Sequence, residues 1–241
     1  MRALILAAGR GERMRPLSDT LAKPLLVAGG KRLIEWQIEA LVRAGIRELV
    51  INTAHLADQI ESTLGDGQRY GARIAYSREG ARAQDALETL GGIVRALPLL
   101  GAEPFLVTSS DIVTDFDYGS LRSATAAIRA GRFDGHLVLV DNPPYHPQGD
   151  MGVEALAPLA ADAPRDAAGE ALLATRASRD YTYANIGVLA PGLFAGLEPV
   201  RARLFPWLYG AVDRKRVSAQ LWHGRWWNVG TPQELAAISS F

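Results

Sequence analysis

Short apolar runs alternate with segments in which apolar residues recur every three or four positions through the first half of the chain. The runs are typical of buried strands, and the periodic segments are typical of amphipathic helices. The pattern predicts strands over residues 3–8, 48–53, 72–77, 104–108 and 136–140. It predicts helices over residues 33–42, 58–64, 91–97 and 121–130, with Pro98 closing the third. This alternation indicates an α/β fold with a doubly wound, mostly parallel sheet.

The pattern changes after residue 141. Residues 147–177 have weak periodicity, and the Ala- and Asp-rich stretch 157–171 is predicted to be a mobile loop. Strands are predicted over residues 181–189, 217–223 and 225–229, and helices over residues 191–197, 204–212 and from Pro232, with Thr231 as N-cap. We therefore expect one domain, residues 1–241, with a Rossmann-like core over residues 1–140 and a smaller sheet-and-helix layer over residues 141–241.

Composition narrows the classes of protein. The 241 residues hold 26 basic and 26 acidic side chains, and this balance predicts neither a nucleic-acid nor a membrane partner. The absence of cysteine excludes disulfides, zinc–thiolate sites and thiol catalysis. The first apolar run is too short to span a bilayer and lacks the flanks of a cleaved signal, so we expect a cytoplasmic protein.

Glycine and basic side chains follow the first predicted strand, at the sheet edge where open α/β sheets bind ligands. Gly9 and Gly11 would let a phosphate approach main-chain N–H groups, and Arg13 and Lys23 add positive charge. A Walker loop is absent, and Met14 occupies the third glycine position of the dinucleotide-binding fingerprint. A dinucleotide-dependent oxidoreductase is therefore disfavoured, whereas a tight turn without function also fits Gly-x-Gly alone.

The longer string resembles the signature L-A-A-G-x-G-x-R-[ML]-x-P, followed by K-P, of the sugar nucleotidyltransferase superfamily. Its elements are Leu6, Ala7, Ala8, Gly9, Gly11, Arg13, Met14, Pro16, Lys23 and Pro24. The resemblance implies an enzyme that joins a nucleoside triphosphate to a sugar 1-phosphate and releases pyrophosphate. It implies that Ala8, Gly9, Gly11 and Arg13 bind the triphosphate, and that Arg13 and Lys23 are catalytic.

Two positions match the metal ligands of this superfamily. Asp111 directly follows a buried predicted strand, which alone indicates only a strand-ending turn, but the resemblance implies that it holds Mg²⁺ as cofactor. The second ligand lies in the family string W-x-D-x-G-T, and here Asn228 stands in place of the aspartate. Its amide oxygen can bind a metal but brings no charge. This departure leaves open a regulatory module that binds nucleotide sugars without turnover.

Further strings match the family at the base and the sugar. Residues 86–93 resemble A-L-E-T-x-G-G-I, which implies nucleotide binding by Glu88, Thr89 and Gly91; a helix start capped by Thr89 is the alternative. For the sugar and its phosphate, the resemblance implies binding by Asp141, Asn142, Asp150, Asn185 and Arg203.

Within the superfamily, the chain most resembles the bacterial N-acetylmuramate 1-phosphate uridylyltransferases. The shared features are its short length, Val140-Asp141-Asn142-Pro143, the Glu88-Thr89 element and Asn185-Ile186-Gly187. The resemblance implies UTP and N-acetylmuramate 1-phosphate as substrates and a role in peptidoglycan recycling. Mannose-1-phosphate guanylyltransferases and glucose-1-phosphate uridylyl- or thymidylyltransferases share the first loop and remain alternatives. The sequence does not predict an oligomeric state.

Overall fold

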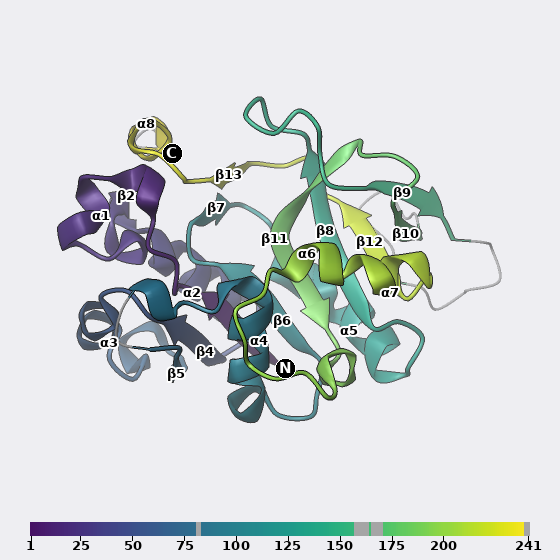
Figure 1. Cartoon of the computed structure of the whole chain (residues 1–241), viewed down its shortest axis with the longest axis horizontal. Coiled ribbons are helices and arrows are strands. Elements are labelled where there is room, and N and C mark those ends of the chain that lie inside the picture. Colours follow the sequence, from purple (N-terminus) through teal and green to yellow (C-terminus); the bar gives the residue numbers. More distant parts are fainter. Residues whose placement is uncertain (81–82, 157–163, 165–170, 239–241) are drawn as a thin grey trace.

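A computed structural model describes residues 1–80, 83–156, 164 and 171–238. Its main sheet has nine strands in the order β5-β4-β1-β6-β11-β8-β12-β10-β9 (Figure 1). Their bounds are β1 Arg2–Leu6, β4 Glu48–Thr53, β5 Arg73–Arg78, β6 Phe105–Ser109, β8 Gly135–Asp141, β9 Gly152–Ala155, β10 Leu172–Thr175, β11 Tyr181–Leu189 and β12 Val217–Leu221.

The strands β5, β4, β1 and β6 pair in parallel, as the apolar runs predict. Strand β11 pairs antiparallel with both β6 and β8, and β12 then pairs in parallel with β8. Strands β10 and β9 complete the sheet in antiparallel pairs. The prediction of a mostly parallel, doubly wound sheet is confirmed, and the second half of the chain extends the same sheet.

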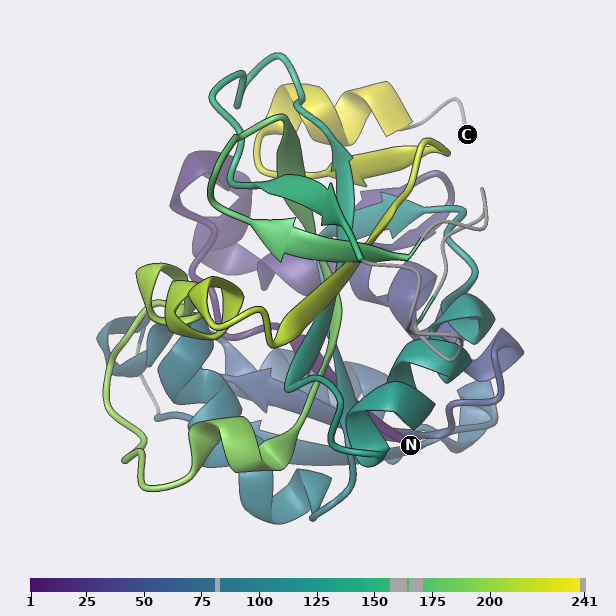
Figure 2. The same ribbon diagram turned by 90° about the vertical axis from the view of Figure 1, so that its right-hand side faces the viewer.

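Helices cover both faces of the sheet (Figure 2). On one face, α2 (Leu33–Arg43) and α5 (Arg122–Arg129) share a core cluster with Ala3 and Ile5 of β1. On the other, α4 (Glu88–Leu100), α6 (Leu204–Trp207) and α7 (Tyr209–Asp213) pack with Leu4. Alternate residues of β1 thus enter opposite cores, as a strand covered on both faces requires. The helix α3 (Ala57–Leu64) also agrees with its prediction.

Several predicted boundaries were wrong. Helix α4 runs through Pro98 to Leu100, because Pro98 is exposed in the last turn while Leu100 is buried. The predicted helix 204–212 is two short helices, α6 and α7, and α6 is itself kinked at Phe205, which precedes Pro206 and has extended angles. The predicted helix 191–197 is a 3-10 turn over Pro191–Phe194. Residues 157–163 and 165–170 of the predicted mobile loop lie outside the described residues.

Two small ribbons and two short helices stand beside the main sheet. Strand β7 (Ile112–Thr114), which the pattern did not predict, pairs with β13 (Trp226–Asn228). Strand β2 (Val27–Ala28) pairs with β3 (Lys31–Arg32). The final helix α8 (Pro232–Ala237) is capped by Thr231, as predicted, and lies near α1 (Leu17–Thr20) and β2 in Figure 1. No helix within the described ranges is long and apolar enough to cross a bilayer.

Candidate active site

The first loop and Asp111 meet because β1 and β6 are parallel neighbours. Leu6 is in register with Ser109, and the Ser110 amide donates to the Leu6 carbonyl at 3.0 Å. Both chain segments therefore leave the sheet at the same edge. The loop folds back through Gly11, which has φ 66°, and the Ser18 hydroxyl donates to its carbonyl at 2.7 Å.

Lys23 reaches Asp111 across the first loop. Its ammonium forms an ion pair with the Asp111 carboxylate, and their side chains are 12% and 22% exposed. A Cβ on Gly11 would lie 3.0 Å from the Lys23 Cβ and Cδ, so glycine allows the lysine stem to lie against the loop. The two side chains neutralise each other's charge. A bound triphosphate would offer Lys23 a second partner.

The ribbon of β7 and β13 brings the end of the chain to the same place. Asn228 is in register with Ile112, and the Val229 amide donates to the Asp111 carbonyl at 2.9 Å. Asn228 and Asp111 are therefore neighbours although more than one hundred positions separate them in sequence. They are the candidate metal donors. In the described part of the chain, this site included, no three His, Asp or Glu side chains gather as a metal site built from the protein alone would require.

Arg13 is held beside this ribbon by the absence of a side chain at Gly230. A Cβ on Gly230 would lie 2.8 Å from Arg13 Nη2, so the guanidinium lies directly over the glycine. The Gly230 amide in turn donates to Glu234 at 2.7 Å. Glu234 is in α8, and the sequence pattern had not singled it out. Arg13, Lys23, Asp111 and Asn228, which were all predicted, thus converge.

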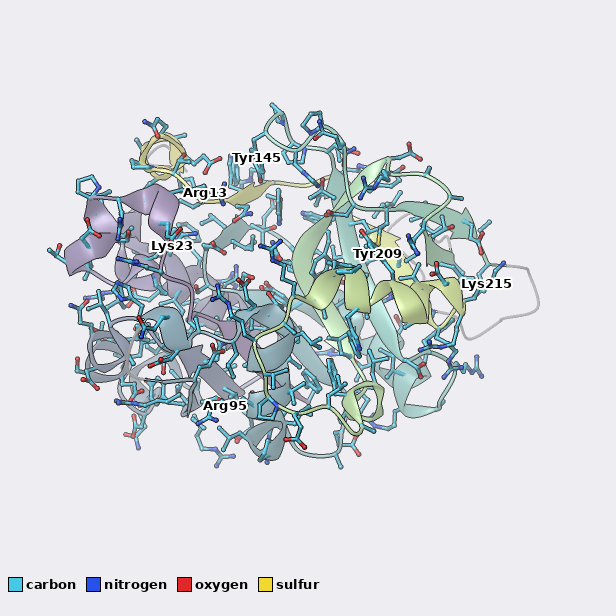
Figure 3. The ribbon with its side chains drawn as sticks, viewed as in Figure 1. Arg13, Lys23, Arg95, Tyr145, Tyr209 and Lys215 are labelled. Atoms are coloured by element: carbon cyan, nitrogen blue, oxygen red, sulfur yellow. The ribbon has the colours of Figure 1, made fainter. Side chains whose placement is uncertain are left out.

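Tyr145 joins these residues, and the sequence analysis missed it. It lies in the loop of residues 142–150 between β8 and β9, and the Asn228 amide is among the groups around its phenol. Glu234, Arg13 and Asp111 are its charged neighbours, and burial is the main cause that raises the pKa of Tyr145 to about 12. Figure 3 shows Tyr145, Arg13 and Lys23 on the same side of the molecule. The only signal was an aromatic residue inside a proline-rich loop.

A cavity of about 600 Å³ opens beside the first loop. This volume is in the usual range for small-molecule sites. The predicted residues Gly9, Gly11 and Glu88 line it, and Glu88 forms an ion pair with Arg201 at 3.3 Å. The complete lining is Gly9, Arg10, Gly11, Glu12, Gln84, Ala86, Glu88 and Arg201. The other five, Arg10, Glu12, Gln84, Ala86 and Arg201, were not predicted as site residues.

A buried hydrogen-bond network joins the chain after β1 to Leu87, the residue that precedes Glu88 and α4. The Asn52 amide accepts from the Ala7 N–H at 2.7 Å and donates to Glu79 at 2.6 Å. The second Glu79 oxygen accepts from the Leu87 N–H, also at 2.6 Å. Burial raises the Glu79 pKa, and the two hydrogen bonds oppose that rise. The network fixes the start of α4 relative to the end of β1.

Thr89 and Gly91 differ in their surroundings. Thr89 is not the helix cap, because α4 begins at Glu88 after Leu87. A Cβ on Gly91 would lie 2.1 Å from the Val200 carbonyl oxygen, so close packing within the protein already requires glycine there. Their predicted nucleotide contacts stay predictions.

Two of the five predicted sugar-binding residues, Asn142 and Asp150, hold the loop of residues 142–150. The Asn142 amide donates to the Arg179 carbonyl at 3.0 Å and accepts from Thr182 at 2.8 Å. Asp150 accepts from the Tyr183 N–H at 2.8 Å and contacts His146 at 3.1 Å. Asp141, outside this loop, pairs with His223 at 3.2 Å and is exposed.

Within the described ranges, the side chains of Asn185 and Arg203, unlike those of Asn142 and Asp150, do not hold the loop of residues 142–150. Asn185 has φ 56° at the β11 bulge, a conformation that costs free energy in any residue except glycine. Its side chain has no hydrogen-bond partner among residues 1–80, 83–156, 164 and 171–238. Arg203 is exposed at the start of α6. These two side chains can therefore contact a ligand without first breaking an internal bond.

Known proteins share this architecture. Residues 2–153 match the nucleotidyl transferase family. An N-acetylmuramate alpha-1-phosphate uridylyltransferase of Neisseria meningitidis serogroup B is 46% identical, over 96% of this chain and 94% of its own. A protein of the same name from Caulobacter vibrioides is 33% identical, over 98% of this chain and 94% of its own.

A solved structure agrees with the fold. A glucose-1-phosphate thymidylyltransferase from Bacillus anthracis, crystallised with a sucrose, superimposes with a TM-score of 0.77 over 100% of this chain and 94% of its own. Its identity is 17%, so this likeness concerns the fold alone. The family match covers more than half of the chain and two relatives match it almost end to end. The chain therefore belongs to the nucleotidyl transferase family, as one of the sugar-1-phosphate nucleotidyltransferases.

Proposed function

We propose that this enzyme transfers the uridylyl group of UTP to N-acetylmuramate 1-phosphate, giving the nucleotide sugar and pyrophosphate. The observation that carries the reaction type is the convergence of Arg13, Lys23 and Asp111 at the carboxyl ends of β1 and β6. The choice of substrates is supported by the two relatives that bear this name and match over nearly their whole length. The reaction would belong to the recycling of cell-wall sugars in the cytoplasm.

The chemistry needs little proton transfer. A sugar phosphate has a second pKa of about 6, so it is already a dianionic nucleophile at neutral pH. One of its oxygens attacks the α-phosphorus of UTP in line, the bond to the β-phosphate breaks, and pyrophosphate leaves. Arg13 and Lys23 bind the triphosphate and offset the negative charge that grows on the leaving group. Positioning and charge stabilisation are therefore the work of the protein.

Asp111 and Asn228 fit a Mg²⁺ site. One carboxylate and one amide oxygen are few donors, and Mg²⁺ takes one or two carboxylates and keeps water and phosphate oxygens as its remaining ligands. When bound, the cation would polarise the phosphate oxygens and neutralise part of their charge. Lys23, which pairs with Asp111, would bind a phosphate oxygen of the triphosphate.

The two halves of the chain would divide the substrates. In residues 1–140, we assign triphosphate and nucleoside binding to Ala8, Gly9, Gly11, Arg13, Glu88, Thr89 and Gly91. In residues 141–241, Asn185 and Arg203 are the strongest candidates for sugar contacts, because their side chains are available. Asn142 and Asp150 would act mainly by shaping the loop of residues 142–150. Asp141 is exposed beside His223, and we keep it as a candidate sugar contact.

Pyrophosphate release tests this assignment. The enzyme is assayed with Mg²⁺ and each of UTP, dTTP, GTP, CTP and ATP against a panel of sugar 1-phosphates. We expect release with UTP and N-acetylmuramate 1-phosphate. Release only with another pair would keep the mechanism and contradict the substrates, and no release with any pair would contradict the proposal.

Lys23→Ala checks the assigned chemistry. We expect kcat to fall on the order of a hundredfold or more, because a charge that stabilises the transition state is lost. Lys31→Ala is the matched control, because Lys31 pairs with Glu39 away from the site and its removal should leave kcat unchanged. Normal turnover by Lys23→Ala would remove this lysine from the mechanism.

A further inference from the structure

The chain just before α6 lies across the first turn of α4 (Figure 1). The Ala202 amide donates to the Leu87 carbonyl, and the Ala202 carbonyl accepts from the Leu90 amide, both at 2.9 Å. On the other side of Arg201, the Val200 carbonyl oxygen packs closely against the same helix. Arg201 therefore stands between two residues that are attached to α4, and its backbone is held at the start of that helix.

The Arg201 side chain lines the cavity beside the first loop. It forms an ion pair with Glu88, which lines the same cavity, at 3.3 Å. The two side chains are 67% and 37% exposed, so a ligand can reach both. Glu88 has φ 60°, a conformation that costs free energy in most residues other than glycine. Strain of this kind beside a cavity points to a functional position.

The charged side chains of this cavity balance one another. Arg10 lies 4.0 Å from Glu12, and Arg201 and Glu88 form the second pair. A cavity whose charges are paired in this way favours a neutral group over a phosphate, and the triphosphate has the cations already proposed for it. The nucleobase is the neutral part of UTP. The cavity therefore suits the base and its ribose.

We propose that Arg201, together with Glu88, recognises the uracil of UTP by its imide edge. A carboxylate only accepts hydrogen bonds, and a guanidinium only donates them. Glu88 accepts from the uracil N3–H, and Arg201 donates to a neighbouring carbonyl oxygen of the base. The single contact between the two side chains leaves a carboxylate oxygen and further N–H groups for these bonds. The inference rests on the proposed function and adds to it the residues that select the base.

This pair should reject cytosine. The N3 of cytosine carries no proton, so its lone pair would face the Glu88 carboxylate whichever carbonyl Arg201 contacts. Two acceptors facing each other repel, and both are left without a hydrogen bond. Thymine has the same imide edge as uracil, so the pair should accept dTTP as well. Guanine also offers an N–H beside a carbonyl, but on a larger ring, and GTP is therefore included in the test.

Glu88→Gln and Arg201→Ala test the two contacts. Calorimetry with Mg²⁺ and without sugar phosphate measures the affinities of UTP, CTP and GTP. We expect the unchanged enzyme to prefer UTP over CTP on the order of a hundredfold. A glutamine NH₂ can donate to cytosine N3, so Glu88→Gln should bind CTP on the order of tenfold more tightly, a gain that misfolding cannot produce. Arg201→Ala should bind UTP on the order of tenfold more weakly.

The matched controls are Glu103→Gln and Arg129→Ala. These two residues form an exposed ion pair at 2.7 Å and do not line the cavity, so their variants should bind all three nucleotides like the unchanged enzyme.

Binding without sugar phosphate separates this inference from the proposed function. If both variants lose the preference for UTP, the inference holds even when no pyrophosphate is released with N-acetylmuramate 1-phosphate, and only the proposed function fails. If both variants keep the preference, the inference is overturned and the proposed function stands. Tighter binding of GTP than of UTP by the unchanged enzyme would overturn both.

Discussion

Gly230 shows how a single absent side chain can position another, here Arg13, which we propose to be catalytic. The Arg13 guanidinium occupies the space that a Cβ at position 230 would need, while the Gly230 amide is held by Glu234. Because the obstructed group is the flexible end of an arginine, an added methyl would move Arg13 without breaking the fold. The lack of a side chain at Gly230 therefore fixes where the Arg13 guanidinium can lie.

We expect Gly230→Ala to fold normally and to lower kcat/KM for UTP on the order of tenfold to a hundredfold, because the guanidinium is displaced from the leaving group. The measurement is steady-state kinetics together with urea denaturation. Gly192→Ala is the control, since a Cβ there meets nothing within 4 Å. Equal kinetics for Gly230→Ala and the unchanged enzyme would show that Arg13 has no fixed position.

Elements with a strong local pattern could be predicted from the sequence. Strands 48–53 and 181–189 agree with β4 and β11 to the residue, because each is a run long enough to show its own burial. Strand β7 has three residues, and its only partner in the ribbon, β13, lies more than one hundred positions away. Local periodicity carries no information about such a pairing.

The site residues also fall into those that the sequence could predict and those that it could not. Arg13, Lys23 and Asp111 lie in motifs that a resemblance can identify, and the structure brings them together. Tyr145 and Glu234 could not be predicted, because their proximity depends on how a loop and the last helix fold over the sheet edge. Asn142 and Asp150 were predicted from other strings of the same resemblance as contacts to a ligand, yet here they bond to the protein's own backbone.

Strand β8 carries a buried histidine, His136, that packs against β12 and should make the free energy of unfolding depend on pH. His136 is fully buried and contacts Ser218 at 2.9 Å and Gln220 at 3.0 Å. Burial lowers its pKa from 6.5 to about 4. Between these values the unfolded chain binds more protons than the folded one, so the free energy of unfolding falls as pH falls, by about 3 kcal/mol in total.

Urea denaturation between about pH 7.5 and about pH 5 tests this expectation. His136→Gln cannot titrate, so its free energy of unfolding should fall less over that range. His223→Gln is the control, because that side chain is 62% exposed and its loss should leave the pH dependence of the parent. Identical pH dependence for His136→Gln and the parent would contradict a titrating core histidine.

At the scale of the whole molecule, the formal charge is zero, so long-range attraction does not concentrate a triphosphate near the site. Binding must come from the few charges gathered at the sheet edge. A ligand that contacts both the first loop, through Arg13 and Lys23, and Asn228 near the C-terminus should stabilise the complete fold. Ligand binding and thermal stability are therefore coupled.

We expect UTP with Mg²⁺, at about one hundred times its Kd, to raise the free energy of unfolding by about 2.7 kcal/mol. Calorimetric melting with and without a chelator measures this effect, and the chelator should remove most of it. The Lys23→Ala variant should gain less from the same ligand concentration. If the melting temperature with UTP were the same with and without Mg²⁺, the proposed metal role of Asp111 and Asn228 would be contradicted.

The contact of Arg13 with Gly230 also has a consequence for synthesis on the ribosome. Chains emerge N-terminus first, and domains tend to fold as they emerge. The parallel strands β5, β4, β1 and β6 can assemble while residues near 228 are still untranslated. Until Asn228 and Gly230 arrive, the nascent chain has the proposed triphosphate loop but neither the proposed second metal donor nor the glycine that makes room for Arg13. A growing chain should therefore acquire UTP-dependent turnover as one of its last folding events.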